Sequence, residues 1–164
     1  MNMKQLNILL ADDDTDDCIF FKQALEELSM STNLTTVNDG EQLMNYLSEN
    51  SEHLPDVLFL DLNMPRKNGF ECLSEIKLSQ KLKQLCVIVF STSFEQEVVN
   101  RLYENGAQYF IRKPSDFSQF NKIIQQTITM ITQKNIAQPT SENFVLTVQN
   151  SSMFNYSFKN NTNY

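Results

Sequence analysis

The sequence predicts an α/β protein built on a five-stranded parallel sheet with helices on both faces. Short, almost continuous apolar runs alternate with stretches whose apolar residues recur at helical spacing, and the alternation repeats five times. Strands covered by helices on both faces read as continuous apolar runs, because neither side of the strand contacts water. The 164 residues suffice for one such domain with an appendage and are too few for two ordinary domains.

The five predicted strands cover residues 6–11, 34–37, 57–60, 87–90 and 109–111. Four of them lead into polar residues that could carry chemistry. The first runs into Asp12 and Asp13, the third into Asp61, the fourth into Ser91, and the fifth is followed closely by Lys113.

A stretch with helical periodicity follows each predicted strand. Thr15 is expected to cap the first helix, and Gly106 is expected to end the fourth. The apolar positions that define the five helices are Ile19, Phe20, Ala24, Leu25 and Leu28; Leu43, Met44 and Leu47; Phe70, Leu73 and Ile76; Val98, Val99 and Leu102; and Phe117, Phe120, Ile123, Ile124, Ile128 and Ile131.

Five strands alternating with five helices are most simply arranged as a doubly wound, flavodoxin-like fold with strand order 2-1-3-4-5. Ligands of such sheets bind beyond the carboxyl ends of the strands, at the switch point between the first and third strands. We therefore expect Asp12, Asp13, Asp61, Ser91 and Lys113 to meet at that edge of the sheet.

The composition narrows the function classes. A net charge of −7 and a pI near 4.7 argue against a sequence-independent basic surface for nucleic acid. No segment has the length and apolarity to cross a bilayer, and residues 1–6 lack the features of a signal peptide, so we expect a cytoplasmic protein. Cys18, Cys72 and Cys86 show no metal or disulfide spacing, and His53 is the only histidine.

The carboxylates expected at the strand ends point to a divalent cation. Asp12, Asp13 and Asp61 would repel one another by several kcal/mol in a partly desolvated cleft unless they are neutralised or protonated. Ligands that are all oxygen favour Mg²⁺. Lys113 and Ser91 suit a phosphoryl group placed on one carboxylate. We assign the remaining acids of the cluster to the start of the first helix, whose dipole favours negative charge; these are Asp14, Asp16 and Asp17.

Four motifs in order carry a family resemblance: Asp12-Asp13, the segment from Asp61 through Pro65 to Gly69, Ser91, and Lys113-Pro114. Together they resemble the receiver domain of two-component response regulators, over about residues 5–134. The segments 61–69 and 90–93 are similar to stand-alone regulators paired with bacterial phytochromes.

The resemblance implies a phosphoacceptor and a metal site. Asp61 would accept a phosphoryl group from a sensor histidine kinase, which could be of phytochrome type, or from a phosphotransfer protein. Asp13 and Asp61 would bind Mg²⁺ directly, together with the backbone carbonyl of Asn63. Asp12 would bind the ion directly or through a water molecule.

The resemblance also implies a conformational switch. Lys113 would pair with a phosphoryl oxygen, Ser91 would hydrogen-bond another, and Phe110 would rotate inward into the space that Ser91 leaves. The Lys113-Pro114 peptide would be cis. The surface of the fourth helix, fifth strand and fifth helix would then bind a partner, and the family also allows a homodimer.

Residues 135–164 differ in character from the rest of the chain, being rich in Asn, Ser and Thr. They nevertheless contain the strand-like run 144–148, followed by Phe154, Tyr156 and Phe158 at a spacing of two. This C-terminal extension is expected to be either disordered or a short β-hairpin that adds to a sheet edge.

Two other functions remain open at this point. A Mg²⁺-dependent phosphohydrolase could use Asp61 as a transient nucleophile on a small molecule, but Asn63 stands where such an enzyme usually has its general acid. A phosphate-independent scaffold would not require the complete set of pocket residues. The favoured prediction is a response regulator whose only catalysis is its own phosphorylation and dephosphorylation.

Overall fold

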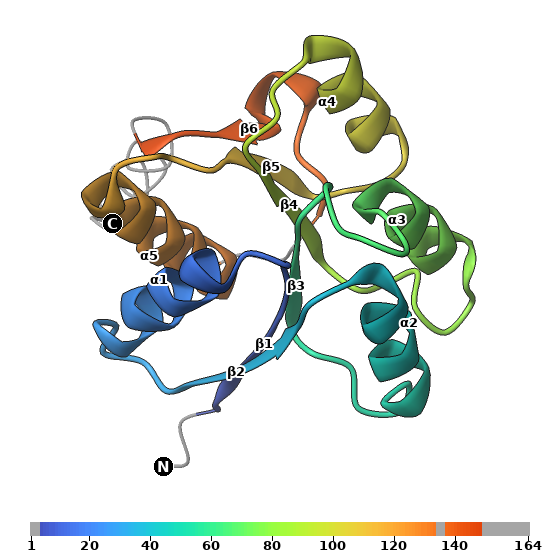
Figure 1. Ribbon diagram of the computed structural model, residues 1–164, viewed down its shortest axis with the longest axis horizontal. Helices are drawn as coiled ribbons and strands as arrows, with labels where there is room; N and C mark the ends of the chain where they lie inside the picture. Colours follow the sequence, from blue (N-terminus) through green and yellow to red (C-terminus); the bar gives the residue numbers. More distant parts are fainter. Residues whose placement is uncertain (1–3, 134–136, 149–164) are drawn as a thin grey trace, which may run out of the picture.

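The computed structural model describes residues 4–133 and 137–148, which form a parallel sheet flanked by five helices (Figure 1). The strands are β1 (Leu6–Ala11), β2 (Thr32–Val37), β3 (Val57–Leu60), β4 (Val87–Ser91), β5 (Tyr109–Arg112) and β6 (Val145–Leu146). The helices are α1 (Thr15–Glu26), α2 (Gly40–Glu49), α3 (Gly69–Leu78), α4 (Gln96–Glu104) and α5 (Phe117–Gln133), with a short 3-10 turn η1 (Ser141–Asn143).

The sheet separates two apolar cores. α1 and α5 lie side by side on one face, and α2, α3 and α4 cover the other (Figure 1). Alternate residues of the central strands enter opposite cores: Leu58 packs toward α2 and α3, whereas Phe59 packs against Phe21 of α1. This double burial explains why β3 and β4 are apolar at every position up to their polar ends.

The predicted order 2-1-3-4-5 is confirmed for the first five strands, but the prediction of five strands in all is wrong. The sheet has six strands in the order β2-β1-β3-β4-β5-β6. β6 comes from the C-terminal extension and runs parallel to β5, with Val145 opposite Phe110. Two strand residues suffice because the extension is also anchored by apolar burial of Phe144 and Leu146, which enter opposite cores.

Hydrogen bonds hold the start of the described extension against α4. The Tyr103 hydroxyl donates to the carbonyl of Pro139 at 2.9 Å, and the Gln138 side chain donates to the carbonyls of Tyr103 and Ala107 at 2.7 and 2.9 Å. The Tyr103 and Phe144 rings meet edge to face, with centroids 5.2 Å apart. The second half of the expected hairpin, residues 154–158, lies outside the described residues.

Several local expectations are corrected. Asp14, not Thr15, caps α1, and its carboxylate accepts the backbone N–H groups of Asp16 and Asp17. Asp14 has extended backbone (φ −85°, ψ 111°) just before the helix, so its carboxylate reaches these amides, whereas Thr15 is already the first helical residue. The Lys113-Pro114 peptide is trans, since the described residues contain no cis peptide bond. Gly106 follows the end of α4 with φ +92°, as a left-handed helix stop requires.

Gly69 keeps the loop after β3 close to the strand end that carries Asp61. Its N–H donates to the carbonyl of Leu62 at 2.9 Å. A Cβ at this position would lie 2.3 Å from the carbonyl oxygen of Asp61 and 2.8 Å from the Cα of Leu62, so no larger residue fits without moving the backbone. The loop therefore places Asp61 through close backbone packing.

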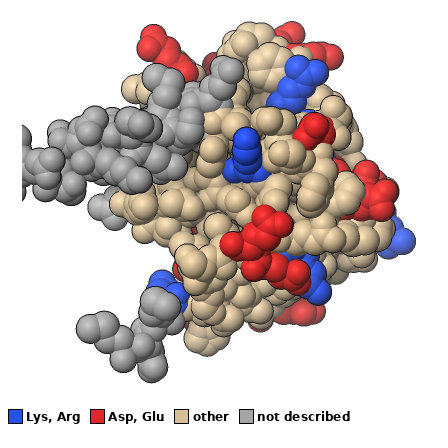
Figure 2. Space-filling model, turned by 90° about the vertical axis from the view of Figure 1, so that its left-hand side faces the viewer, with Lys and Arg blue, Asp and Glu red and all other residues tan. Residues whose placement is uncertain are grey.

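The surface mixes charges of both signs. On the α1 and α5 side, lysine and arginine side chains stand singly among acidic ones (Figure 2). Among the described residues, no helix is both long enough and apolar enough to cross a bilayer.

A matched pair of leucines tests whether β6 belongs to the folded core. Leu146 of β6 is 2% exposed, whereas Leu78 at the end of α3 is 84% exposed. We expect Leu146→Ala to lower the free energy of unfolding by about 2–4 kcal/mol, because it opens a cavity. Leu78→Ala should lower it by less than about 0.5 kcal/mol. Urea unfolding measures both, and equal small losses would show that β6 adds nothing to the core.

Candidate functional site

Three carboxylates meet at the carboxyl edge of the sheet. Ala11 and Leu60 are paired across β1 and β3, so the residues that follow them, Asp12 and Asp61, leave adjacent strands side by side. The Asp61 N–H donates to the Ala11 carbonyl at 2.9 Å and continues this pairing. One carboxylate oxygen from each of Asp12, Asp13 and Asp61 lies within 4.8 Å of the others. The predicted convergence of these three residues is therefore what the fold produces.

Lys113 supplies the positive charge of this site. It follows β5, and its backbone N–H donates to the Ser91 carbonyl at 2.8 Å, which anchors the residue beside β4. Its Nζ lies 2.7 Å from Asp12 Oδ2, 2.9 Å from Asp17 Oδ2 and 3.6 Å from Asp61 Oδ2. The Lys113 side chain is only 5% exposed, so these ion pairs are largely withdrawn from water.

The burial of these groups shifts their pKa values. Loss of solvation raises the pKa of Asp61 to about 6; the Lys113 charge opposes this shift, and the Asp12 and Asp13 charges add to it. Loss of solvation also raises the pKa of Asp12 above its usual range, although Lys113 again opposes it. Burial alone would lower the pKa of Lys113, but the hydrogen bond and attraction from Asp12, with smaller contributions from Asp61 and Asp17, outweigh it and raise that pKa. Lys113 therefore stays charged near neutral pH, whereas burial disfavours the ionised forms of Asp12 and Asp61.

The donor set fits a hard divalent cation. All the candidate ligand atoms are oxygens, and like-charged carboxylates whose pKa is raised by burial gain from a cation between them. Asp12 is fully buried, Asp61 is 5% exposed and Asp13 is exposed, so the site opens to solvent on the Asp13 side. An open side suits an ion that keeps water ligands and admits a phosphoryl oxygen.

The cysteines are not part of this donor set. All three are free, and burial raises the pKa of Cys18 and Cys72 to about 11 and that of Cys86 to about 12. These thiols remain protonated near neutral pH in the metal-free protein, and none of them lies in the carboxylate cluster. Cys72 and Cys86 are buried, and Cys18 is partly buried.

Asp17 is a site residue that sequence reasoning missed. We assigned it to the charge at the start of α1, but its carboxylate pairs with Lys113 at 2.9 Å. Its position in the sequence could have indicated this contact. α1 begins only a few residues after β1, so the first turn of the helix lies close to the strand ends. A side chain in that turn can face the site while the exposed Asp16 beside it faces solvent.

Ser91 and Asn63 are engaged in the surrounding loops. Ser91 is fully buried at the end of β4, and its Oγ accepts the N–H of Ser93 at 3.3 Å. The Asn63 side chain donates to the Ser93 hydroxyl at 3.1 Å, so the loops after β3 and β4 are joined. The Asn63 backbone N–H lies 3.5 Å from Asp61 Oδ1, at the limit of a hydrogen bond.

Phe110 is fully buried in the core on the α2, α3 and α4 side. The exposed ring of Phe94, in the loop after β4, covers it at a centroid distance of 6.0 Å, and the guanidinium of Arg112 lies 5.8 Å from the Phe94 ring centroid. On the other side, the Phe110 N–H donates to the Phe144 carbonyl at 3.0 Å. Phe110 thus links the loop after β4 with the C-terminal extension.

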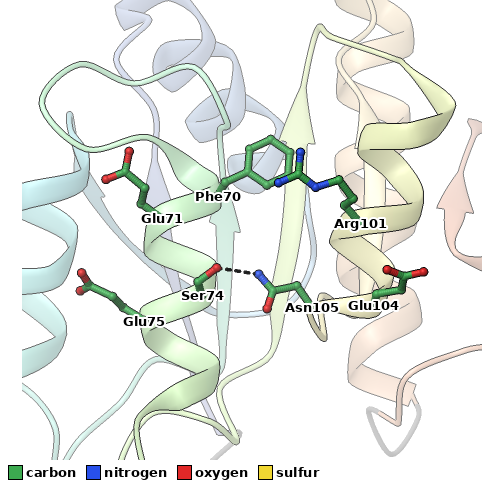
Figure 3. A pocket seen from close by; sticks show the side chains of 7 residues that line it. All are labelled: Phe70, Glu71, Ser74, Glu75, Arg101, Glu104 and Asn105. Carbon is green, nitrogen blue, oxygen red and sulfur yellow. Dashed lines mark hydrogen bonds between the residues drawn. The ribbon is translucent and has the colours of Figure 1, made fainter.

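A separate cleft of about 680 Å³ lies between α3 and α4 and shares none of these residues (Figure 3). The Arg101 guanidinium lies over the Phe70 ring, 5.3 Å from its centroid, and Asn105 donates to the Ser74 hydroxyl at 2.8 Å. These contacts tie the two helices together across the cleft.

Comparison with known proteins agrees with this geometry. The family described as the response regulator receiver domain matches residues 8–125. The response regulator Rcp1 of Synechocystis sp. is 30% identical over 122 residues, which cover 72% of this chain and 83% of Rcp1.

Solved structures extend the likeness to the whole fold. The phosphorylated cyanobacterial phytochrome response regulator RcpA superimposes with a TM-score of 0.76 at 30% identity, covering 81% of this chain and 99% of RcpA. The Mn²⁺-bound form of Rcp1 gives a TM-score of 0.72 at 28% identity, covering 82% of this chain and 99% of that structure. The chain belongs to the family of response regulator receiver domains.

Proposed function

We propose that this response regulator receives a phosphoryl group on Asp61 with the help of Mg²⁺. The observation that carries the proposal is the meeting of Asp61 with buried Asp12, exposed Asp13 and the buried Lys113 ammonium at one sheet edge. Asp12, Asp13, Asp61 and the Asn63 carbonyl would hold the ion. Bound Mg²⁺ would neutralise charge on the phosphoryl oxygens during transfer.

The chain's own residues would divide the remaining work. An Asp61 carboxylate oxygen attacks phosphorus in line, forming an O–P bond while the P–N bond to the donor histidine breaks and the imidazole leaves. Lys113 Nζ lies 3.6 Å from the Asp61 carboxylate. From there it would stabilise the negative charge on the phosphoryl group. Because Asp61 must be ionised to attack, transfer should slow as Asp61 is protonated.

The donor in this proposal is a sensor histidine kinase or a phosphotransfer protein. Similarity to phytochrome response regulators supports a phytochrome-type kinase, and in this proposal the chain would meet such a donor in the cytoplasm. Nothing in the site favours a phosphohydrolase, since the Asn63 amide cannot act as a general acid. Slow hydrolysis of its own aspartyl phosphate would be the only other reaction.

The surface formed by α4, β5 and α5 would change on phosphorylation and transmit the signal. Phosphate on Asp61 would draw the Ser91 hydroxyl toward it, and the loop that carries Phe94 would move with Ser91. Phe94 covers Phe110, so this movement reaches β5 and, through the Phe110 N–H, the extension. The face so changed would bind a partner or a second copy of the chain.

Asp61 phosphorylation can be tested with Mg²⁺ and acetyl phosphate, read by intact mass. We expect the mass of one phosphoryl group to be added, stable in acid and lost in base. Asp61→Asn should abolish the adduct, and chelation of Mg²⁺ should prevent it. Asp56→Asn, at the opposite end of β3, should leave it unchanged. An undiminished adduct on Asp61→Asn would refute the assignment.

The raised pKa of Asp61 predicts that its ionised carboxylate lowers the free energy of unfolding of the metal-free protein. With a folded pKa of about 6 against 3.8 unfolded, the folded state binds more protons between these values, so rising pH destabilises it. Asp61→Asn should therefore be more stable than wild type by about 2–3 kcal/mol at pH 7.5.

Urea unfolding in EDTA measures this difference. The gain from Asp61→Asn should shrink as the pH falls from 6 toward 4, because the wild-type carboxyl then becomes neutral in the fold. A gain that stays constant across this range, or a loss of stability at pH 7.5, would contradict the expectation.

A further inference from the structure

We infer that Asp17 restrains the Lys113 ammonium and thereby sets how strongly the site binds a phosphoryl group, an inference that rests on the proposed function. Asp17 is a positioning residue in this account, because it acts on the phosphoryl group through Lys113. The charge it carries opposes the binding of an anion and favours that of a cation.

The distances show which carboxylates hold the ammonium. Lys113 Nζ lies within hydrogen-bond reach of Asp12 at 2.7 Å and of Asp17 at 2.9 Å, and at the longer distance of 3.6 Å from Asp61. Two of the three ammonium protons are thus directed away from the acceptor carboxylate. Asp17 is the one partner of the three that does not belong to the carboxylate cluster.

The backbone fixes Asp17 in place. The Asp17 N–H donates to the Asp14 carboxylate at 3.2 Å, within the N-terminal cap of α1. α1 is in turn tied to α5, where Gln125 donates to the Ala24 carbonyl at 3.2 Å. The N-terminal end of α1 is therefore fixed in place, and it holds the Asp17 carboxylate next to Lys113.

The contact between Lys113 and Asp17 is easier to break than the contact between Lys113 and Asp12, because Asp17 is closer to solvent. The Asp17 side chain is 21% exposed, whereas that of Asp12 is fully buried. Water can replace Lys113 at Asp17 at lower cost than at Asp12, where a bare buried carboxylate would remain. A phosphoryl oxygen arriving at Asp61 would accordingly draw Lys113 from Asp17 and leave the Asp12 contact in place.

The inference can be tested with beryllofluoride, an analogue of the bound phosphoryl group, at saturating Mg²⁺ in titration calorimetry. We expect Asp17→Asn to bind it about fivefold to tenfold more tightly than wild type, because the Lys113 charge is released toward Asp61. Asp17→Glu, which keeps the charge, should return the affinity toward the wild-type value.

Asp16→Asn is the matched control. It removes the same charge from the same turn of α1 at an exposed position, so it reports the general effect of charge and helix capping alone. Its beryllofluoride affinity should stay within about twofold of wild type. Without beryllofluoride, Asp17→Asn should weaken Mg²⁺ binding more than Asp16→Asn does.

The outcomes separate the two proposals. If wild type fails to bind beryllofluoride with Mg²⁺, the proposed function fails. If wild type binds it but Asp17→Asn binds no more tightly than Asp16→Asn, the role of Asp17 is overturned while the function stands. Weaker binding by Asp17→Asn would likewise overturn the role.

Discussion

The site depends on one electrostatic constraint: buried carboxylates from adjacent strands share a single buried ammonium. Asp12 and Asp61 are brought together by the pairing of β1 with β3, and the backbone bond from Lys113 to Ser91 holds the lysine beside them. Removing the lysine would leave uncompensated charge in a place that water does not reach. The tight loop at Gly69 and the cap of α1 keep these groups in position.

This arrangement explains why Asp61, the proposed phosphoacceptor, has a raised pKa. The pKa of Asp61 is raised to about 6 because burial outweighs the attraction of Lys113. The carboxylate is therefore ionised near neutral pH but poorly stabilised, which favours reaction with a cation and a phosphoryl group. The same imbalance makes the ionised form of this proposed acceptor destabilise the fold.

The sequence was sufficient to predict the first five strands, their order and the meeting of Asp12, Asp13, Asp61 and Lys113. These follow from the periodicity of the apolar residues and from the rule that parallel strands end at one edge. The contact of Asp17 with Lys113 was missed, because the direction of a side chain in the first helical turn depends on where the helix starts. Placing the cap at Thr15 instead of Asp14 obscured it.

β6 was not counted among the predicted strands for a different reason. The run 144–148 has a strand-like pattern, but its place in the sheet depends on the burial of Phe144 and Leu146 in cores formed by distant segments. The result is that the outer edge of β5 is already paired at Phe110 and Ile111. A partner that approaches β5 from this edge meets the extension first, so the extension and the proposed output face form one surface.

The most direct measurement of the central constraint is a double-mutant cycle between Lys113 and Asp12, by urea unfolding in EDTA at pH 7.5. We predict that Lys113→Met lowers the free energy of unfolding by about 3–5 kcal/mol, because it leaves Asp12 buried without a counter-charge. Adding Asp12→Asn should recover at least about 1 kcal/mol of that loss beyond any effect that Asp12→Asn has on the wild type. Additive effects would contradict the account, because they would show that the buried carboxylate and the ammonium do not depend on each other.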